Sequence, residues 1–222
     1  MIYIALFLGI AFSMYAQFKI QKNFSKYSEV PSKSGMTGAQ VAKMILDRRG
    51  VYDVSVEPVE GMLTDHYDPR SKKVRLSESV FYSTSISAVS VAAHEVGHAI
   101  QHNEQYAFLN FRSALAPVAS FTSKFVYLLM FIGLASDIMG LVDLAIVFFF
   151  LALLFQIITL PVEFNASSRA LYNLQDYNVL AQDEISSSKK VLSSAAMTYV
   201  AATAVSAINL LRLILIRNSR RR

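Results

Sequence analysis

Residues 94–98, with the sequence HEVGH, have the residue types and spacing for metal-assisted hydrolysis. On a helix, residues four apart lie one above the other, so the imidazoles of His94 and His98 can bind one zinc ion. Glu95 projects near the open side of the metal, where a carboxylate can remove a proton from a zinc-bound water. The surrounding residues are small or apolar, as in a buried active-site helix: Ala92, Ala93, Val96, Ala99 and Ile100. The alternative is an amphipathic helix with three stray polar residues, which are costly to bury without a partner.

A catalytic zinc site needs a third protein ligand and one open position. His102 is the nearest candidate, but it lies one helical turn beyond His98, about 6 Å further along the axis. Three ligands on successive turns do not converge easily, and no glycine interrupts the helix between them. Glu163 is a better candidate, because two histidines and a glutamate form a known catalytic set. From spacing alone, an acid at the membrane edge explains Glu163 equally well.

Residues near Glu163 are candidates for hydrogen bonds to the zinc histidines. Gluzincins often place an aspartate four residues after the ligand glutamate, whereas this chain has Ser167 there and Asn165 before it. Either oxygen can accept an imidazole N–H, although neither brings a charge. We expect His102 to be either a surface histidine or another hydrogen-bond partner of the metal site.

The segment 65–69, with the sequence DHYDP, offers two further candidate catalytic residues. His66 or Tyr67 can donate a hydrogen bond to a tetrahedral oxyanion. The alternative is a polar turn built on Asp68 and Pro69, which the spacing slightly favours.

The composition predicts a membrane protein. The chain has 222 residues, of which 54% are hydrophobic, and a mean hydropathy of +0.38, more apolar than an ordinary soluble domain. It has no cysteine, which excludes disulfides and thiolate zinc ligands. The net charge is +5, but the basic residues lie beside apolar runs and at the C-terminus. This distribution is typical of a membrane protein that follows the positive-inside rule and contacts anionic lipid. We find no nucleic-acid motif.

Apolar runs of spanning length divide the chain. Residues 1–18 carry no charged side chain and are followed by lysines, which predicts an uncleaved transmembrane helix with its N-terminus outside. Residues 114–160 predict a transmembrane hairpin that turns at Ser136 and Asp137. Residues 191–216 form a last apolar run, interrupted by Asn209 and Arg212. If this run spans once, the basic tail 217–222 lies outside, contrary to the positive-inside rule. The run is then re-entrant or broken near Asn209, or the orientation is reversed.

The polar segments are expected to form the catalytic part. Residues 19–112 are predicted to face the cytoplasm, beginning with a basic connector over 19–35. A capping box at Thr37 and Gln40 predicts a helix that Gly50 ends. Alternating patterns around Val56 and Val74 predict a strand pair flanking the loop 61–71, and a serine-rich cap precedes the zinc helix. Residues 161–190 are expected to be a third-ligand helix and a polar loop. The predicted fold is mainly α, with about four membrane helices and a small gluzincin-like α+β domain containing a short β-hairpin.

Three motifs together resemble the YugP-like family of bacterial membrane zinc metallopeptidases. They are DHYDP at 65–69, HEVGHAIQH at 94–102 and LPVEFNAS at 160–167. The resemblance covers nearly the whole chain, and a more distant one connects it to the HtpX-type membrane proteases. It implies a multi-pass protein of the bacterial plasma membrane, one zinc ion per chain, peptidase activity and Glu163 as the third ligand.

The expected function is zinc-dependent hydrolysis of peptide bonds in membrane or membrane-proximal proteins, with Glu95 as general base. The expected partners are protein or peptide substrates and the lipid bilayer, whereas a homo-oligomer or a regulatory membrane partner is left open. One alternative is an intramembrane protease of the site-2 type, but the segment around residues 94–98 lacks a spanning apolar run. Another is a non-catalytic scaffold whose zinc is closed by His102 or His66. A transport accessory subunit is suggested only by the polarity of the last apolar run.

Overall fold

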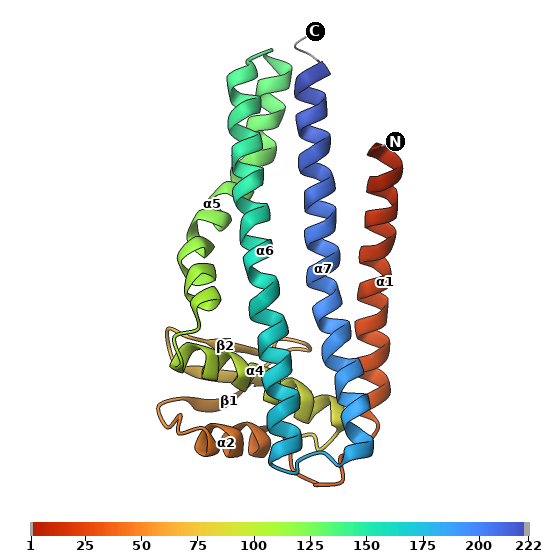
Figure 1. The fold of residues 1–222 in the computed structure, drawn as a ribbon, viewed down its shortest axis with the longest axis vertical. Helices are drawn as coiled ribbons and strands as arrows, with labels where there is room; N and C mark the ends of the chain where they lie inside the picture. The colour runs from red at the N-terminus through yellow and green to blue at the C-terminus, as the bar shows by residue number, and fades with distance from the viewer. Residues whose placement is uncertain (1, 220–222) are drawn as a thin grey trace. The chain divides into compact units, whose positions relative to one another are not determined.

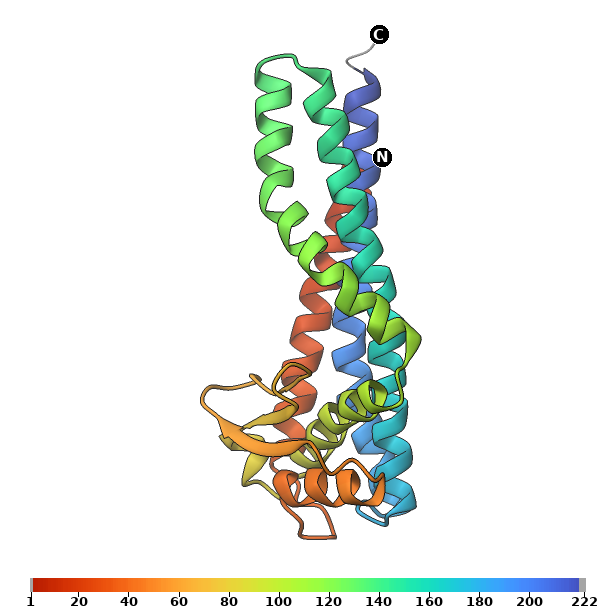
Figure 2. The same cartoon turned by 90° about the vertical axis from the view of Figure 1, so that its left-hand side faces the viewer.

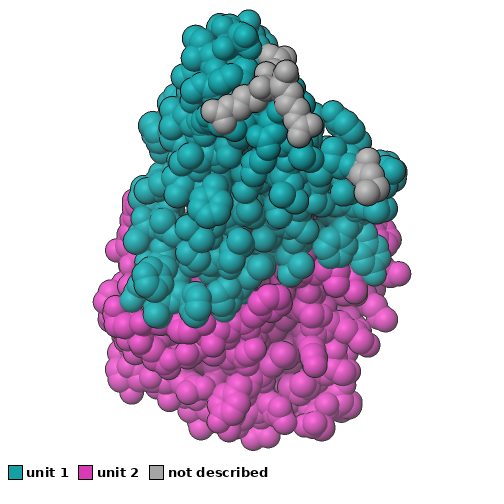
Figure 3. Space-filling view, turned by 45° about the horizontal axis from the view of Figure 1, so that its top comes forward, with its two compact units in different colours: residues 1–16, 107–161, 198–222 teal, residues 17–106, 162–197 magenta. Residues whose placement is uncertain are grey.

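The computed structural model describes residues 2–219, and most of them lie in helices. The chain divides into two compact units, coloured separately in Figure 3. Unit 1 comprises residues 1–16, 107–161 and 198–222, and unit 2 comprises residues 17–106 and 162–197. Unit 2 therefore joins most of the predicted catalytic segment to the predicted third-ligand segment. The prediction of a mainly helical fold with a small sheet is confirmed.

Unit 2 contains a three-stranded sheet with the order β1-β3-β2. The strands are β1 (Ser55–Val59), β2 (His66–Asp68) and β3 (Lys73–Ser77). Val56 and Val74 are paired neighbours as expected, but β1 and β3 run parallel rather than as a hairpin. The antiparallel hairpin is instead formed by β2 and β3, where Tyr67 pairs with Val74. Parallel strands need a long connection, and the loop expected over 61–71 contains β2 within it.

Two short helices of unit 2 begin at the caps that the sequence predicts. In α2 (Gly38–Arg48), the Thr37 hydroxyl accepts from the backbone of Gln40, and the Gln40 side chain accepts from the backbone of Thr37. Gly50 has a φ of +69°, a conformation that glycine adopts without strain. A single turn, α3 (Glu78–Phe81), precedes α4 (Ile86–Asn103), which is capped by the Ser85 hydroxyl.

Helix α4 lies at the centre of the unit 2 core. Most of its apolar side chains are fully or almost fully buried: Ala88, Val89, Ala92, Ala93, Val96, Ala99 and Ile100. Val41 and Ile45 of α2 and Val74 and Leu76 of β3 belong to the same apolar cluster. Packing on the other faces of α4 therefore holds in place the helix that carries His94 and His98.

The first helix, α1 (Ile2–Ser28), extends beyond the predicted end at residue 18. Part of the expected connector 19–35 is therefore helical. Phe24 and Tyr27 are buried in the core of unit 2, and the Ser87 hydroxyl donates to the carbonyl oxygen of Phe24 over 2.9 Å. The polar residues of this part are compatible with helical structure. The contacts with the core of unit 2 therefore stabilise the helix beyond residue 18.

Within residues 2–219, four helices are long and apolar enough to cross a membrane: α1, α5 (Ala107–Ala135), α6 (Met139–Asp176) and α7 (Gln182–Ser219). Figures 1 and 2 show α5 and α6 joined by a tight connection, and Asp137 there has a φ of 55°. Within unit 1, the buried contacts include Val126, Val142 and Leu210. Helix α5 contains Pro117, and Figure 2 shows it bending partway along its length.

Two elements differ from the expected ones. Helix α6 continues through Pro161 to Asp176, so the candidate ligand Glu163 lies on the helix that begins in the second half of the hairpin. Proline removes one helical hydrogen bond but does not always end a helix. Helix α7 is continuous from Gln182 to Ser219, without the break considered near Asn209. The polar Arg212 is accommodated there, with its guanidinium 5.4 Å from the centre of the Tyr3 ring.

Candidate metal centre

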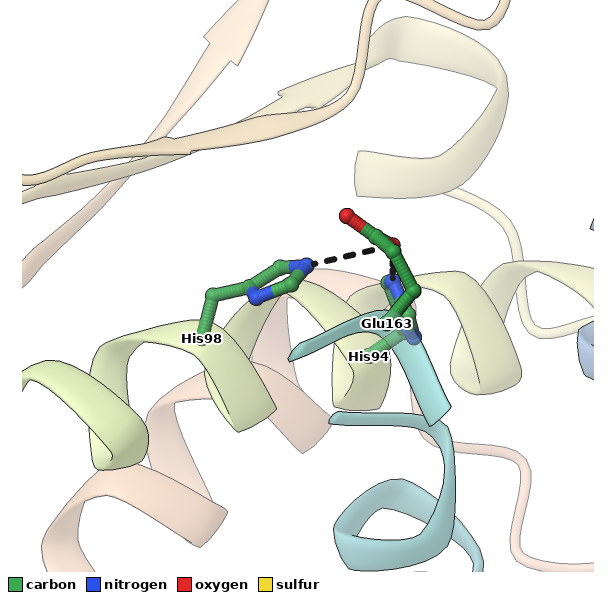
Figure 4. Close-up of side chains that lie close together, drawn as sticks. All are labelled: His94, His98 and Glu163. Atoms are coloured by element: carbon green, nitrogen blue, oxygen red, sulfur yellow. Dashed lines mark ion pairs between the residues drawn. The ribbon is translucent and has the colours of Figure 1, made fainter. Parts of the chain in front are cut away.

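Three side chains from α4 and α6 converge in unit 2. His94 Nε2 lies 3.4 Å from Glu163 Oε2, and His98 Nε2 lies 3.7 Å from the same oxygen. Figure 4 shows the two imidazoles projecting from α4 toward the carboxylate. One candidate ligand atom from each residue lies within 4.8 Å of the others. This is the arrangement expected when two histidines one turn apart face a glutamate on a second helix.

A close helix crossing brings Glu163 to α4. A Cβ atom added at Gly97 would lie 2.8 Å from the carbonyl oxygen of Ala166 and 3.2 Å from its Cα. Both are backbone atoms of α6, so only glycine permits this approach. Gly97 follows Val96 in the zinc motif, and Ala166 follows Glu163 by less than one helical turn. The packing of these two small residues therefore sets the position of the third candidate ligand.

The donor atoms fit a zinc ion. The side chains of His94, His98 and Glu163 are 14%, 11% and 4% exposed, respectively. Two imidazole nitrogens and one carboxylate oxygen form a known set for catalytic zinc, which leaves a position open for water or substrate. Among residues 2–219, this is the cluster of histidine and acidic residues identified as able to hold a metal.

The electrostatics of the cluster also favour a cation. Burial lowers the pKa of His98, but the hydrogen bond to Glu163 and the charges of Glu95 and Glu163 outweigh this effect and raise it. A buried imidazole whose surroundings stabilise positive charge lies where a metal cation would be stabilised as well. Glu95 is itself buried, with an exposed fraction of 8%.

The second ring nitrogen of each histidine has a polar partner. Ser167 Oγ lies 3.2 Å from His94 Nδ1, at the position where gluzincins often have an aspartate. Gln101 Oε1 lies 3.0 Å from His98 Nδ1. Asn165 is one step further away, with its Oδ1 accepting from Gln101 Nε2 over 2.9 Å. Sequence reasoning identified Ser167 and Asn165 but missed Gln101, although Gln101 stands three residues after His98, a spacing that places both on one helix face.

His102 is not brought to the cluster. Its Nδ1 lies 2.8 Å from the hydroxyl oxygen of Tyr67, on the neighbouring strand β2. Burial raises the pKa of Tyr67 to about 12, assisted by the charges of Asp53 and Asp68. The hydroxyl therefore keeps its proton at neutral pH. His102, Tyr67 and Asp53 also line a small polar cavity of about 140 Å³.

His66 is exposed and held away from the cluster. Its Nδ1 lies 2.7 Å from the carbonyl oxygen of Thr64, and its Nε2 lies 3.5 Å from Arg75 Nη1. Because side chains alternate along a strand, His66 and Tyr67 project from opposite faces of the sheet. Tyr67 is therefore the member of this pair that faces α4.

The rest of the segment 65–69 has structural contacts. The Asp65 carboxylate accepts hydrogen bonds from the backbone N–H and the hydroxyl of Ser77. Burial raises the pKa of Asp65, hydrogen bonds from Ser77 oppose this, and the charge of Glu95 adds to it. Asp68 accepts from the Ser71 hydroxyl and the backbone of Arg70, which hold its carboxyl pKa well below the usual range. The predicted turn at Asp68 is thus present, directly after β2.

Comparisons with known proteins show which family the chain belongs to. Residues 2–218 match the family described as "Putative neutral zinc metallopeptidase". The chain is 52% identical over 209 residues to the Bacillus subtilis (strain 168) protein named "Putative membrane protease YugP", covering 94% of this chain and 92% of that protein. No solved structure matches the chain significantly. The resemblance to the YugP-like family and the expectation of zinc as cofactor are thereby confirmed, and the chain belongs to this family of membrane zinc metallopeptidases.

Proposed function

We propose that this metallopeptidase is a membrane-embedded endopeptidase that cleaves membrane or membrane-proximal proteins, with zinc held by His94, His98 and Glu163. The observation that carries the proposal is the convergence of these three side chains, of which His98 and Glu163 are buried and His94 is partly buried, beside the buried carboxylate of Glu95. A bound zinc ion supplies a Lewis acid that acidifies water and polarises a carbonyl group.

The residues of the chain would perform the proton transfers. Glu95 accepts the proton of the attacking water on its carboxylate and then delivers it to the departing amine. Its burial keeps bulk water from competing for that proton. Of the two candidate oxyanion donors, Tyr67 is favoured over His66, because it lies on the face of the sheet toward α4 and keeps its proton.

The sheet edge suggests how a substrate is held. In the order β1-β3-β2, strand β2 is an edge strand, and it contacts α4. An extended peptide added beside β2 would form main-chain hydrogen bonds and run along the zinc helix. Such binding recognises an unfolded or extended segment, so it favours endopeptidase activity on flexible parts of proteins.

Two alternatives lose support. Helix α4 is not among the helices of residues 2–219 that are long and apolar enough to span a membrane, which disfavours an intramembrane site of the site-2 type. A closed structural zinc site needs a fourth ligand, but the candidates His102 and His66 are hydrogen-bonded to Tyr67 and Thr64. An open fourth position is the arrangement of a catalytic zinc site.

We also propose that α1, α5, α6 and α7 cross the bacterial plasma membrane and that the active site faces the cytoplasm. Their length and composition support this topology. Four crossings place both ends of the chain on the same side. Lysines at positions 19, 22 and 26 and at positions 189 and 190 lie on the side assigned to the cytoplasm. The arginines of the basic tail 217–222 count against this orientation under the positive-inside rule.

The proposed function is tested by measuring zinc per chain and cleavage of an unfolded protein with detergent-purified variants. Wild type and Glu95→Gln should each hold one zinc ion, Glu163→Ala should lose it, and only wild type should cleave. Glu104→Gln removes a carboxylate from the end of α4, outside the cluster, and should behave as wild type in both measurements. Cleavage by Glu95→Gln would refute the general-base role, and full zinc content in Glu163→Ala would refute the ligand set.

A further inference from the structure

Gln101 is a fully buried polar side chain in contact with both helices of the metal centre. Its Oε1 lies 3.0 Å from His98 Nδ1. Its Nε2 donates to the carbonyl oxygen of Val162 over 2.8 Å and to Asn165 Oδ1 over 2.9 Å. The amide thus connects one proposed ligand, His98, to the backbone residue directly before another, Glu163.

The partners of Gln101 fix which way its amide points. A backbone carbonyl can only accept a hydrogen bond, so the atom facing Val162 must be the NH₂ group. The second contact agrees, provided that Asn165 presents its oxygen. Arg169 shows that this Asn165 atom is the oxygen, because Arg169 Nε donates to the same atom over 2.7 Å and a guanidinium can only donate.

This arrangement of donors and acceptors determines which ring nitrogen of a neutral His98 carries the hydrogen. With its NH₂ group engaged twice, Gln101 presents only its oxygen to His98. The Nδ1 atom of a neutral His98 must therefore carry the hydrogen, which leaves Nε2 with a free lone pair. Nε2 is the atom that faces Glu163 Oε2. Free rotation of the Gln101 amide would instead allow the opposite tautomer, in which Nε2 carries hydrogen and cannot bind a metal.

We propose that Arg169, Asn165 and Gln101 form a positioning relay that holds His98 in the Nδ1–H tautomer and ties its helix to the segment carrying Glu163. The inference rests on the proposed function in that it takes His98 and Glu163 as zinc ligands. It assigns Gln101 and Arg169 as positioning residues, which act on the metal through His98 and not by contact with substrate. Partners of this kind commonly change metal affinity by about 10- to 100-fold when they are removed.

The other histidine has no comparable constraint. His94 Nδ1 is 3.2 Å from Ser167 Oγ, and a hydroxyl can donate as well as accept. Ser167 therefore tolerates either tautomer of His94. The two histidines are therefore unequal: Gln101 fixes the tautomer of a neutral His98, whereas the contact with Ser167 leaves the tautomer of His94 open.

Arg169 also forms an ion pair with Glu104, with 2.7 Å between Arg169 Nη2 and Glu104 Oε2. This contact joins the same two helices, so loss of Arg169 has two consequences. Glu104 is substantially exposed, with 46% of its side chain accessible, and a pair of this kind contributes little to stability. Glu104→Gln removes the ion pair but leaves the Arg169 Nε bond to Asn165, which makes it the matched control.

The test measures the zinc dissociation constant of the full-length, detergent-purified protein by chelator competition, together with the thermal stability of the zinc-free protein. Gln101→Leu and Arg169→Met should weaken zinc binding by about 10- to 100-fold. Asn165→Leu should do the same, whereas Asn165→Asp keeps the accepting oxygen and should bind nearly as tightly as wild type. Glu104→Gln should also retain wild-type affinity.

The outcomes separate the relay from the proposed function. Wild-type affinity in Gln101→Leu or Arg169→Met would overturn the relay and leave the zinc site standing. An equal loss of affinity in Arg169→Met and Glu104→Gln would assign the effect to the ion pair and also overturn it. If Gln101→Leu does not fold, the contrast between Asn165→Asp and Asn165→Leu still decides. Absence of zinc binding by wild type would refute the ligand set itself.

Discussion

Replacing Gly97 by alanine tests whether the helix crossing sets the metal site. The added Cβ would lie 2.8 Å from Ala166 O, 3.2 Å from Ala166 Cα and 3.3 Å from Ala166 C. All three are backbone atoms, so relief requires movement of α6 or α4 rather than rotation of a side chain. Ordinary contact begins near 3.4 Å, so the helices must separate locally by about 0.6 Å.

The expected change in stability is the difference between two effects. Alanine favours a helix interior over glycine by about 1 kcal/mol. Overpacking a well-packed contact costs about 1–3 kcal/mol, and rigid backbone neighbours place this case in the upper part of that range. We therefore expect Gly97→Ala to lower the free energy of unfolding by about 1–2 kcal/mol. Because Glu163 lies on the displaced segment, zinc affinity should fall by about tenfold.

Thermal unfolding of the zinc-free protein and chelator competition measure the two effects separately. The matched control is Gly140→Ala, in α6, where the added Cβ would meet no atom within 4 Å apart from its chain neighbours and the nearby backbone of its own helix. This variant should be as stable as wild type or more stable by about 0.4–1 kcal/mol, with unchanged zinc affinity. A Gly97→Ala protein with wild-type stability and zinc affinity would refute the claim that this crossing positions Glu163.

Three further predictions concern zinc and topology. Chelation should lower the free energy of unfolding of wild type by about 3–4 kcal/mol, compared with protein in free zinc at 100 to 1,000 times its dissociation constant. Calorimetry should show no such loss for Glu163→Ala. Ser167→Asp should tighten zinc binding by about tenfold in chelator competition, because a carboxylate beside His94 Nδ1 makes the imidazole a stronger ligand; weaker binding would contradict this. The chain has no cysteine, so single cysteines can be placed at the exposed Tyr52 and at Ser136, between α5 and α6. The two cysteines should react with an impermeant thiol reagent from opposite sides of the membrane. Position 136 should be the one labelled in intact cells.

The features that the sequence predicts well depend on near neighbours in the chain. Helical spacing alone places His94 and His98 on one face, and the capping box of Thr37 and Gln40 marks the start of α2. The serine cap of α4 and the tight turn between α5 and α6 are equally local. In each case, the atoms that interact are separated by only a few residues, so the pattern of residue types contains the necessary information.

The features that were missed depend on distant pairs. Gln101 meets Val162 and Asn165 across 61 and 64 positions, and no local pattern indicates those partners. The parallel pairing of Val56 with Val74 was likewise not encoded in the alternation of either strand. The continuity of α6 through Pro161 has a different cause. Proline only biases a helix toward ending, and the packing of Val162, Ala166 and Ala170, all fully buried, outweighs that bias.

The two histidines and the glutamate therefore reach the metal centre by different routes. His94 and His98 are brought together by the geometry of one helix, because residues four apart share a face. Glu163 arrives only when α6 crosses α4 at Gly97, and Gln101 ties that crossing to His98. An exposed ion pair such as Arg169 with Glu104 contributes at most about 1 kcal/mol to the crossing. Close packing and the buried amide must therefore hold it before metal binds. A substitution that loosens the crossing should then weaken zinc binding while leaving α4 helical, whereas a substitution that unfolds α4 should abolish both.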